Sequence, residues 1–469
     1  MPLPDLIEII PLNAPLRAQV TVPGSKSITN RALILAALAE GETVLQGALW
    51  SEDTQVMVNA LKKLGFGVKV EPDPEEFCNR TILVNGQGGK IPEAGTADVP
   101  LEIFVGNAGT VARFLAPLVC LGHGFYKLHG VPRMHERPQA ALFQALRQLG
   151  YQVDSPNNKL PAVIRGSGPR PGRCKVDIQE SSQFASGLIL CSTKGGWHIE
   201  LTFEPQGEPP YVNMTSKLLA IFPGRGGSFQ IEPDASSGSY FWAADRLVPG
   251  PELRYVERLE VSLPTQPHGA ISVAHWPTSS WQIDEHFPAV VRRSAALHYG
   301  LEFHQNQAHR PEMKKDYLNM FDSPAISRET DLGDSIMTAI VLAPFGLEPT
   351  RFTDLGRMRV QESERVVALR VELEKCGGKV IETGDTLEVV PSELHGAEIE
   401  TYDDHRMAMC FAILGLKVPG IKIKNPSCVK KTFPNFFQKL AGSPPYGLGA
   451  RIMNGATETI LENDQLFPD

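Results

Sequence analysis

The pattern of apolar and polar positions repeats one phrase along the chain: an apolar-faced helix, a glycine and a short apolar strand. Residues 61–68 and 146–153 share the spacing LxxLGxxV, and residues 373–380 form a weaker copy. A glycine just after a helix is a frequent C-cap, because its backbone can turn left-handed. Each phrase therefore predicts the end of a helix, a tight turn and the start of a strand.

The glycines of this phrase are regularly spaced. They stand at positions 65, 150, 224, 300 and 377, separated by 74 to 85 residues, and a helix ending at Gly442 makes a sixth copy. This period is too long for a solenoid and favours a duplicated α/β unit. Because helix, glycine and strand follow one another in many α/β proteins, coincidence is the alternative. The segment from Ser443 departs from the rhythm, and we expect it to lie on the surface.

Composition narrows the class of protein. A chain of 469 residues is long enough for two or three domains. Its net charge of −8 argues against binding nucleic acid through a broad basic surface. Its seven cysteines include no CxxC pair, which favours a reducing compartment and argues against disulfides or structural zinc. No signal peptide is recognisable, and no uninterrupted apolar stretch reaches about 18 residues. We therefore expect a soluble, cytoplasmic protein that binds neither nucleic acid nor membrane.

Unusual polar residues gather where apolar helices are expected to begin. Lys26, Ser27 and Arg31 follow a Pro-Gly-Ser loop and lead into the apolar run 32–39. Free amides at a helix start, together with cations, suit a phosphate or carboxylate ligand. The GxxxxGK[ST] spacing of a Walker loop is absent. Similar polar blocks open the helices expected after residues 106–110, 180–183, 331–334, 361–365, 403–406 and 431–434.

Each block also has an ordinary explanation, since Asp, Ser and Asn commonly cap helices and Asp334 or Glu362 could do only that. Cations at helix starts are different, because the helix dipole disfavours them there. Five side chains break that preference: Lys26, Arg31, Arg113, Arg365 and Arg406. We infer that these helix starts converge on at least two anionic groups, with Asp334 and Glu362 as candidate general acids and bases. No spacing typical of a metal site is present, and none is implied.

Eight blocks, taken in order, resemble the family of 5-enolpyruvylshikimate-3-phosphate (EPSP) synthases, also called 3-phosphoshikimate 1-carboxyvinyltransferases. The matching blocks are residues 23–32, 106–110, 132–138, 181–184, 234–241, 359–365, 404–410 and 431–434. Together they span nearly the whole chain. The resemblance implies a two-domain inside-out α/β barrel, each domain built of three βαβαββ units. The implied domains are residues 24–235, then residues 1–23 with 236–442, and a C-terminal extension at 443–469.

The resemblance also implies a reaction. The enolpyruvyl group of phosphoenolpyruvate would move to the 5-hydroxyl of shikimate 3-phosphate, with release of phosphate, in the shikimate pathway to chorismate and aromatic amino acids. It implies no cofactor and no metal, and we expect a monomer whose partners are these two small molecules. By the same resemblance, the proton-transfer group is Lys26, Asp334 and Glu362.

The resemblance assigns further residues to the two substrates. The residues implied for shikimate 3-phosphate are Lys26, Ser27, Arg31, Ser181, Ser182, Gln183, Asp334 and Gln361. The residues implied for phosphoenolpyruvate are Lys26, Asn107, Gly109, Arg133, Gln183, Arg365, Arg406 and Lys431.

Three positions depart from the family pattern on the acceptor side. Gln361 stands where the family usually has lysine, Arg357 stands in place of an asparagine, and Glu208 falls near an expected serine. Losing a cation weakens phosphate binding unless Arg357 compensates. Two alternatives therefore stay open: an enolpyruvyl-transferase paralogue that acts on a different cyclohexene alcohol, and a non-catalytic ligand-binding regulator. Related enzymes that use a loop cysteine as acid fit less well, because Cys120 lies in an apolar helix end, where a packed thiol is expected.

Overall fold

The computed structural model describes residues 3–13, 16–202, 209–248, 270–291, 325–346 and 348–468. Contacts within the chain divide it into two compact units. The central unit, named for its place in the sequence, is Pro23–Asp234; the terminal unit is Met1–Val22 with Ala235–Asp469. The chain passes between the two units after Val22 and after Asp234, and each point lies one residue from the boundary that the resemblance implies. The arrangement of three repeated units per inside-out barrel stays a prediction.

Two sheets of the central unit share one topology. The first has the order β12-β3-β5-β4 and the second the order β6-β7-β9-β8. In each sheet the first pair is parallel and the other two pairs are antiparallel. A third, two-stranded sheet pairs β10 with β11 in parallel. The strands are β3 (Glu40–Leu49), β4 (Gly67–Pro72), β5 (Asn79–Gln87), β6 (Leu101–Phe104), β7 (His123–His129), β8 (Gln152–Asp154), β9 (Ala162–Ser167), β10 (Gly172–Val176), β11 (Trp197–Leu201) and β12 (Gly227–Gln230).

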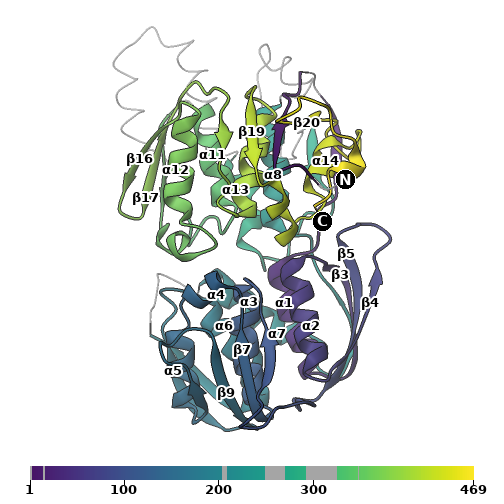
Figure 1. Cartoon of the computed structure of the whole chain (residues 1–469), viewed down its shortest axis with the longest axis vertical. Helices are drawn as coiled ribbons and strands as arrows, with labels where there is room; N and C mark the ends of the chain where they lie inside the picture. Colours follow the sequence, from purple (N-terminus) through teal and green to yellow (C-terminus); the bar gives the residue numbers. More distant parts are fainter. Residues whose placement is uncertain are drawn as a thin grey trace, which may run out of the picture. The chain divides into compact units, whose positions relative to one another are not determined.

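Three helices of the central unit pack against one another: α1 (Lys26–Leu38), α3 (Gly109–Cys120) and α6 (Gln183–Gly195). A helix that is apolar on all sides belongs in a core. Every residue of α3 is buried, as is every residue of α1 from its third position onward. Figure 1 shows α1 lying along the sheet that contains β3, β4 and β5. The other helices are α2 (Glu52–Lys63), α4 (Pro132–Glu136), α5 (Ala140–Gln148) and α7 (Pro210–Ile221).

The terminal unit repeats this sheet topology twice. Its four-stranded sheets have the orders β14-β15-β17-β16 and β18-β19-β1-β20, each with one parallel pair followed by two antiparallel pairs. A third sheet pairs β2 with β13 in parallel. The strands are β1 (Leu6–Ile9), β2 (Ala18–Val20), β13 (Ile271–Val273), β14 (Ala325–Ser327), β15 (Thr350–Thr353), β16 (Lys379–Thr383), β17 (Thr386–Val390), β18 (Glu398–Ile399), β19 (Ile421–Lys424) and β20 (Ile452–Asn454).

Helix α13 (His405–Gly415) is buried along its whole length in the terminal unit, and it packs against α8, α11 and β19. Helix α12 covers β16, as Figure 1 shows. The remaining helices are α8 (Ala235–Leu247), α11 (Ile336–Leu342), α12 (Arg365–Lys375) and α14 (Phe436–Ala441). Short 3-10 turns are η2 (Ile283–His286), η3 (Ala343–Phe345), η4 (Gly356–Val360), η5 (Pro426–Lys431) and η6 (Asn463–Gln465).

Three copies of the helix-glycine-strand phrase have the expected geometry. Gly65, Gly150 and Gly377 follow α2, α5 and α12 with φ of 88°, 86° and 89°, and the strands β4, β8 and β16 come next. Two copies differ. Helix α7 is capped by Phe222 before Gly224 is reached, and Gly442 caps α14 with a φ of −55°. Gly300 lies outside the described residues.

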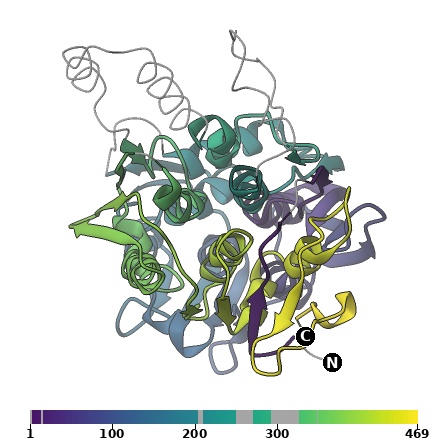
Figure 2. The same cartoon turned by 90° about the horizontal axis from the view of Figure 1, so that it is seen from above.

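The segment from Ser443 was expected at the surface, and this expectation is wrong for part of it. Strand β20 pairs with β1 and completes one edge of its sheet. Figures 1 and 2 show the C-terminal segment in yellow beside the N-terminal strand in purple. Leu448, Ile452 and Leu466 are buried. The segment carries too few apolar residues to look like core by itself, and its burial depends on a strand more than 400 residues earlier in the sequence.

We therefore predict that Ile452→Ala destabilises the terminal unit by about 2–5 kcal/mol, the usual cost of truncating a buried isoleucine. Urea denaturation followed by circular dichroism measures this free energy. Tyr446→Ala is the matched control, because Tyr446 is 78% exposed in the same segment and its truncation leaves the unfolding midpoint unchanged. Equal midpoints for the two variants would contradict the packing of β20.

Candidate active site

The starts of three helices meet in the central unit. Asn30 in α1 donates to the hydroxyl of Thr110 in α3 at 3.3 Å, and Arg113 in α3 donates to the amide oxygen of Gln183 in α6 at 2.7 Å. The first residues of these helices are Lys26, Gly109 and Gln183, all predicted site residues. The structure therefore brings together the first turns that the polar blocks at helix starts singled out.

The close approach of α3 and α6 depends on Gly187. A β-carbon at this position would lie 2.3 Å from the carbonyl oxygen of Arg113, well inside van der Waals contact. Any side chain would push the two helices apart and separate Arg113 from Gln183. Gly109 is similarly enclosed, since a β-carbon there would meet the guanidinium groups of Arg113 and Arg137 at 2.8 Å and 2.7 Å.

Lys26 is held from two directions within the central unit. Its Nζ lies 3.2 Å from a carboxylate oxygen of Asp53, and its backbone N–H donates to Asp234 at 3.2 Å. Ser27, the next residue of α1, is partly buried. The two carboxylates offset the helix dipole, which disfavours a cation at the first position of a helix. Neither Asp53 nor Asp234 was predicted as a site residue.

Arg31 is almost fully enclosed, with an exposed fraction of 1%. Its guanidinium donates to Thr215 and Ser186 at 2.7 Å and 3.1 Å, and to the backbone oxygens of Ser27 and Tyr211. Burial lowers the pKa of Arg31 to about 10, against a smaller raising effect of Tyr211. Here Arg31 joins α1 to α6 and α7, and its contact with a ligand stays a prediction.

The remaining predicted residues of the central unit lie at or near these helix starts. Ser181 and Ser182 are buried immediately before α6, and the Ser181 hydroxyl accepts the backbone N–H of Gln183. Asn107 precedes α3, and its carbonyl accepts from Arg137 at 2.9 Å. Arg133 in α4 is more exposed and pairs with Glu136 at 2.6 Å.

The terminal unit contains a second group of charged side chains, called here the arginine–carboxylate cluster: Asp334, Glu362, Arg365, Asp404 and Arg406. Arg365 is the first residue of α12, and Asp404 is the N-cap of α13. The carboxylate of Asp404 accepts from Nε and Nη2 of Arg365 at 2.7 Å and 3.1 Å, and from the backbone N–H of Arg406 at 3.0 Å. Asp404 thus caps one helix and pairs with the first side chain of another.

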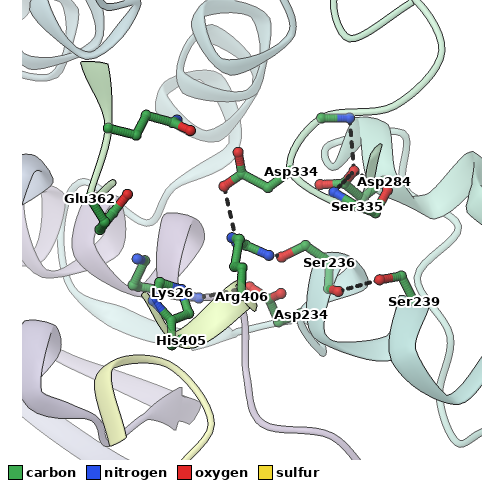
Figure 3. A network of polar contacts seen from close by, with 12 residues as sticks. Lys26, Asp234, Ser236, Ser239, Asp284, Asp334, Ser335, Glu362, His405 and Arg406 are labelled. Carbon is green, nitrogen blue, oxygen red and sulfur yellow. Dashed lines mark hydrogen bonds and ion pairs between the residues drawn. The ribbon is translucent and has the colours of Figure 1, made fainter. Parts of the chain in front are cut away.

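Asp334 faces three arginines. Its two oxygens lie 3.0 Å from Arg406 and 3.2 Å from Arg328, and Arg365 is 3.9 Å away. Burial raises the pKa of Asp334, but the combined charge of Arg406, Arg365 and Arg328 outweighs it and holds the pKa well below its usual value. Figure 3 shows Asp334 pointing to Arg406, which also donates to Ser236 at 3.1 Å. Asp334 is therefore ionised at neutral pH.

Glu362 lies between two cations of the terminal unit. Its oxygens are 3.0 Å from Arg365 and 3.4 Å from Lys431. Glu362 precedes α12, three residues before Arg365. Glu364, and not Glu362, caps this helix by accepting the N–H of Val367. Gln361 accepts from Arg365 at 2.6 Å.

Several partners of these residues were missed by the sequence analysis. Asp404 had a signal, because it stands two residues before Arg406 in a polar block and N-caps are commonly aspartate. Asp53 and Arg328 had none, because neither belongs to the polar blocks that the sequence analysis singled out. Glu208, one of the three departures from the family pattern, lies outside the described residues. Cys120 is a packed thiol, as expected: burial raises its pKa far above the usual value.

The comparisons with known proteins now decide the family. The family model described as EPSP synthase (3-phosphoshikimate 1-carboxyvinyltransferase) matches residues 11–225 and 269–440. The chain belongs to the EPSP synthase family. A relative from Opitutus terrae named 3-phosphoshikimate 1-carboxyvinyltransferase is 36% identical, covering 94% of this chain and 98% of the relative. A relative of the same name from Trichormus variabilis is 34% identical, covering 93% of this chain and 98% of the relative.

Solved structures agree on the fold of this EPSP synthase family member. The EPSP synthase of Acinetobacter baumannii covers 96% of this chain and 100% of its own, with a TM-score of 0.63 and 19% identity. The enolpyruvyl transferase NikO of Streptomyces tendae covers 98% of this chain and 100% of its own, with a TM-score of 0.60 and 15% identity. These mixed α/β neighbours support the predicted fold class. Within the described parts of the chain, no helix is long and apolar enough to cross a membrane.

The cluster predicts a large stability effect at Asp404. Asp404→Ala removes two charge-assisted hydrogen bonds from the buried Arg365, which is left with Glu362 and Gln361, and it uncaps α13, so we expect a loss of about 3–5 kcal/mol in unfolding free energy. Urea denaturation measures it. Glu398→Gln is the control, because Glu398 forms an exposed pair with Lys424 in the same unit and its loss should leave stability close to that of the unmodified protein. A small effect at Asp404 would show that Arg365 does not depend on it.

Proposed function

We propose that the chain transfers the enolpyruvyl group of phosphoenolpyruvate to the 5-hydroxyl of shikimate 3-phosphate and releases phosphate. The observation that carries this proposal is the arginine–carboxylate cluster, in which cations surround Asp334 and Glu362. It occurs in a chain whose curated relatives are named for this reaction. The product leads to chorismate and the aromatic amino acids.

The reaction needs two protons to leave, from the hydroxyl and later from C3, and two to arrive, at C3 and on the phosphate as it is expelled. First, the substrate hydroxyl loses a proton and its oxygen attacks C2 of phosphoenolpyruvate, while C3 gains a proton. The resulting tetrahedral intermediate then loses a proton from C3 and expels phosphate as the C2–O bond breaks. Carboxylates beside cations can exchange these protons, and arginines stabilise the phosphate and carboxylate charges. We assign the proton transfers to Lys26, Asp334 and Glu362.

The cations around Asp334 suggest how its basicity depends on substrate. With no anion bound, Arg406, Arg365 and Arg328 keep its pKa low, which makes it a weak base. We assign Arg365 and Arg406 to the anionic groups of phosphoenolpyruvate. When the substrate's negative charges lie on these arginines, less positive charge acts on Asp334 and its pKa rises. Asp334 therefore becomes an effective base only with substrate in place.

The assignments to the two substrates follow the family pattern. We place phosphoenolpyruvate on Lys26, Asn107, Gly109, Arg133, Gln183, Arg365, Arg406 and Lys431. We place shikimate 3-phosphate on Lys26, Ser27, Arg31, Ser181, Ser182, Gln183, Asp334 and Gln361. Gln361 differs from the family's lysine, because it is uncharged and already accepts a hydrogen bond from Arg365.

A phosphate-release assay with phosphoenolpyruvate tests the proposed function. We expect release with shikimate 3-phosphate and little with shikimate, which lacks the phosphate. Release with shikimate but not its 3-phosphate would favour the paralogue that uses another cyclohexene alcohol. Binding of phosphoenolpyruvate without release with either acceptor would favour a regulator. Either of these last two results would overturn the proposal.

Neutralising the carboxylates separates chemistry from binding. Asp334→Asn and Glu362→Gln should each lower turnover by about 10²–10⁴-fold, because an amide cannot exchange protons, while changing the dissociation constant of phosphoenolpyruvate much less. Steady-state kinetics and calorimetric titration measure the two quantities. Glu374→Gln is the control, since Glu374 is exposed on α12 and pairs only with Arg370 in the described contacts. Near-normal turnover of either variant would remove that residue from the proton-transfer group.

Gln361→Lys tests the departure on the acceptor side. A lysine adds a cation for the 3-phosphate, so we expect the Michaelis constant for shikimate 3-phosphate to fall by about tenfold, the lower end for a hydrogen bond to a charged group. Gln361→Met is the matched control, because it also removes the acceptor that Arg365 uses but adds no charge. If both variants change only the constant for phosphoenolpyruvate, Gln361 serves Arg365 and not the acceptor.

A further inference from the structure

A buried carboxylate that the sequence analysis did not single out lies directly behind Asp334. Asp284, in η2, has an exposed fraction of 4%. One of its oxygens, Oδ1, accepts three hydrogen bonds: from the backbone N–H of Gly333 at 2.8 Å, and from the backbone N–H and hydroxyl of Ser335 at 3.0 Å and 2.5 Å. Figure 3 shows this contact beside Asp334. A single oxygen thus holds the backbone on both sides of Asp334.

The start of α11 is held by a residue distant in sequence, whereas a helix start is usually held by its own N-cap side chain. Ser335 is the N-cap of α11, yet its side chain makes no cap hydrogen bond and donates to Asp284 instead. The carboxylate that replaces the local cap is about 50 residues earlier in the sequence. Burying a carboxylate is costly unless its hydrogen bonds are satisfied. An exposed serine or aspartate N-cap would hold a helix start at lower cost, so capping alone does not account for Asp284.

The same short segment also holds a second helix start. Gln282, two residues before Asp284, is buried, and its amide oxygen accepts the backbone N–H of Ala235 at 3.0 Å. Ala235 begins α8, and the next residue, Ser236, accepts from Arg406 at 3.1 Å. Gln282 and Asp284 therefore fix the two backbone segments that carry the partners of Arg406, namely Ser236 and Asp334.

We propose that Asp284 is a positioning residue for Asp334, and that with Gln282 it forms a brace that sets the geometry of Arg406 and Asp334. With Gly333 and Ser335 fixed, the only freedom left to Asp334 is its two side-chain torsions. Those torsions place one oxygen on Arg406 and the other on Arg328. Asp284 does not touch the reacting atoms in this proposal, which rests on the function assigned above.

The charge of Asp284 fits this role. Burial raises its pKa, and the nearby Asp334 raises it further, while the donors of Ser335 and the charge of Arg406 oppose them. The two acids share Arg406 as a counter-ion, so moving Asp284 disturbs the charge balance at Asp334 as well as its position. The hydrogen-bonding role needs only an acceptor at Oδ1, which an asparagine also offers. Charge and position can therefore be separated by substitution.

The test compares Asp284→Ala with Asp284→Asn. Alanine removes the acceptor, so Asp334 shifts, and turnover per folded molecule should fall by about 100-fold, the scale for a misplacement of about 1 Å. Asparagine keeps the acceptor and should recover most of that loss. The Michaelis constant for phosphoenolpyruvate should change much less than turnover in both. The folded fraction comes from circular dichroism, so that a loss of folded protein is not mistaken for a loss of turnover.

Two further measurements keep the proposal open to refutation. Loss of contact with Arg406 raises the pKa of Asp334, so the acidic limb of the turnover profile moves to higher pH in Asp284→Ala. In Asp284→Asn the contact is kept and one nearby negative charge is lost, so the limb does not move to higher pH. A crystal structure of the alanine variant, or of the asparagine variant if alanine does not fold, reads the position of Asp334 without any assay. We expect Asp334 off Arg406 in the first and on it in the second.

The outcomes separate this proposal from the proposed function. If the unmodified protein shows no turnover, the proposed function fails, and the crystal structures still decide whether Asp284 positions Asp334. If Asp284→Ala folds, keeps normal turnover and leaves Asp334 on Arg406, the brace is refuted. A displaced Asp334 in Asp284→Asn would also refute it, because the acceptor at Oδ1 would then not be what holds the backbone.

Discussion

The terminal unit depends on one electrostatic constraint: arginines stand at the starts of helices, where the helix dipole repels cations. Arg365 begins α12 and Arg406 is the second residue of α13. The carboxylate of Asp404 offsets this by pairing with Arg365 and capping α13 at once. Because Arg365 is 1% exposed, water does not stabilise its charge, and removing Asp404 takes away two of the hydrogen bonds that do.

The same constraint prepares a site for anions. Helix starts offer free N–H groups and positive potential, and the arginines add charge to it. In the structure, Asp334 pairs with Arg406, and Glu362 pairs with Arg365 and Lys431. A substrate with a phosphate and a carboxylate can compete for those cations, and it alters the basicity of the acids that it displaces. Binding and proton transfer are therefore linked through shared arginines.

Much of this could be predicted from the sequence, for identifiable reasons. Gly65, Gly150 and Gly377 signal helix ends locally, and the cations at helix starts stand out because they break a local preference. The partners that make those cations possible are not local. Asp284 and Asp53 come from other elements, Arg328 stands six residues before Asp334, and nothing in their own sequence neighbourhood distinguishes them from ordinary surface charges. The burial of β20 was missed for the same reason, since it depends on pairing with β1.

The most direct test of the account is a crystal structure of the protein with phosphoenolpyruvate and shikimate 3-phosphate bound. The account predicts the phosphate and carboxylate of phosphoenolpyruvate on Arg365, Arg406 and Lys431, with the carboxylates of Asp334 and Glu362 turned from those cations toward C3 and the 5-hydroxyl. Phosphoenolpyruvate bound away from these arginines, with Asp334 still on Arg406 and Glu362 still on Lys431, would contradict it.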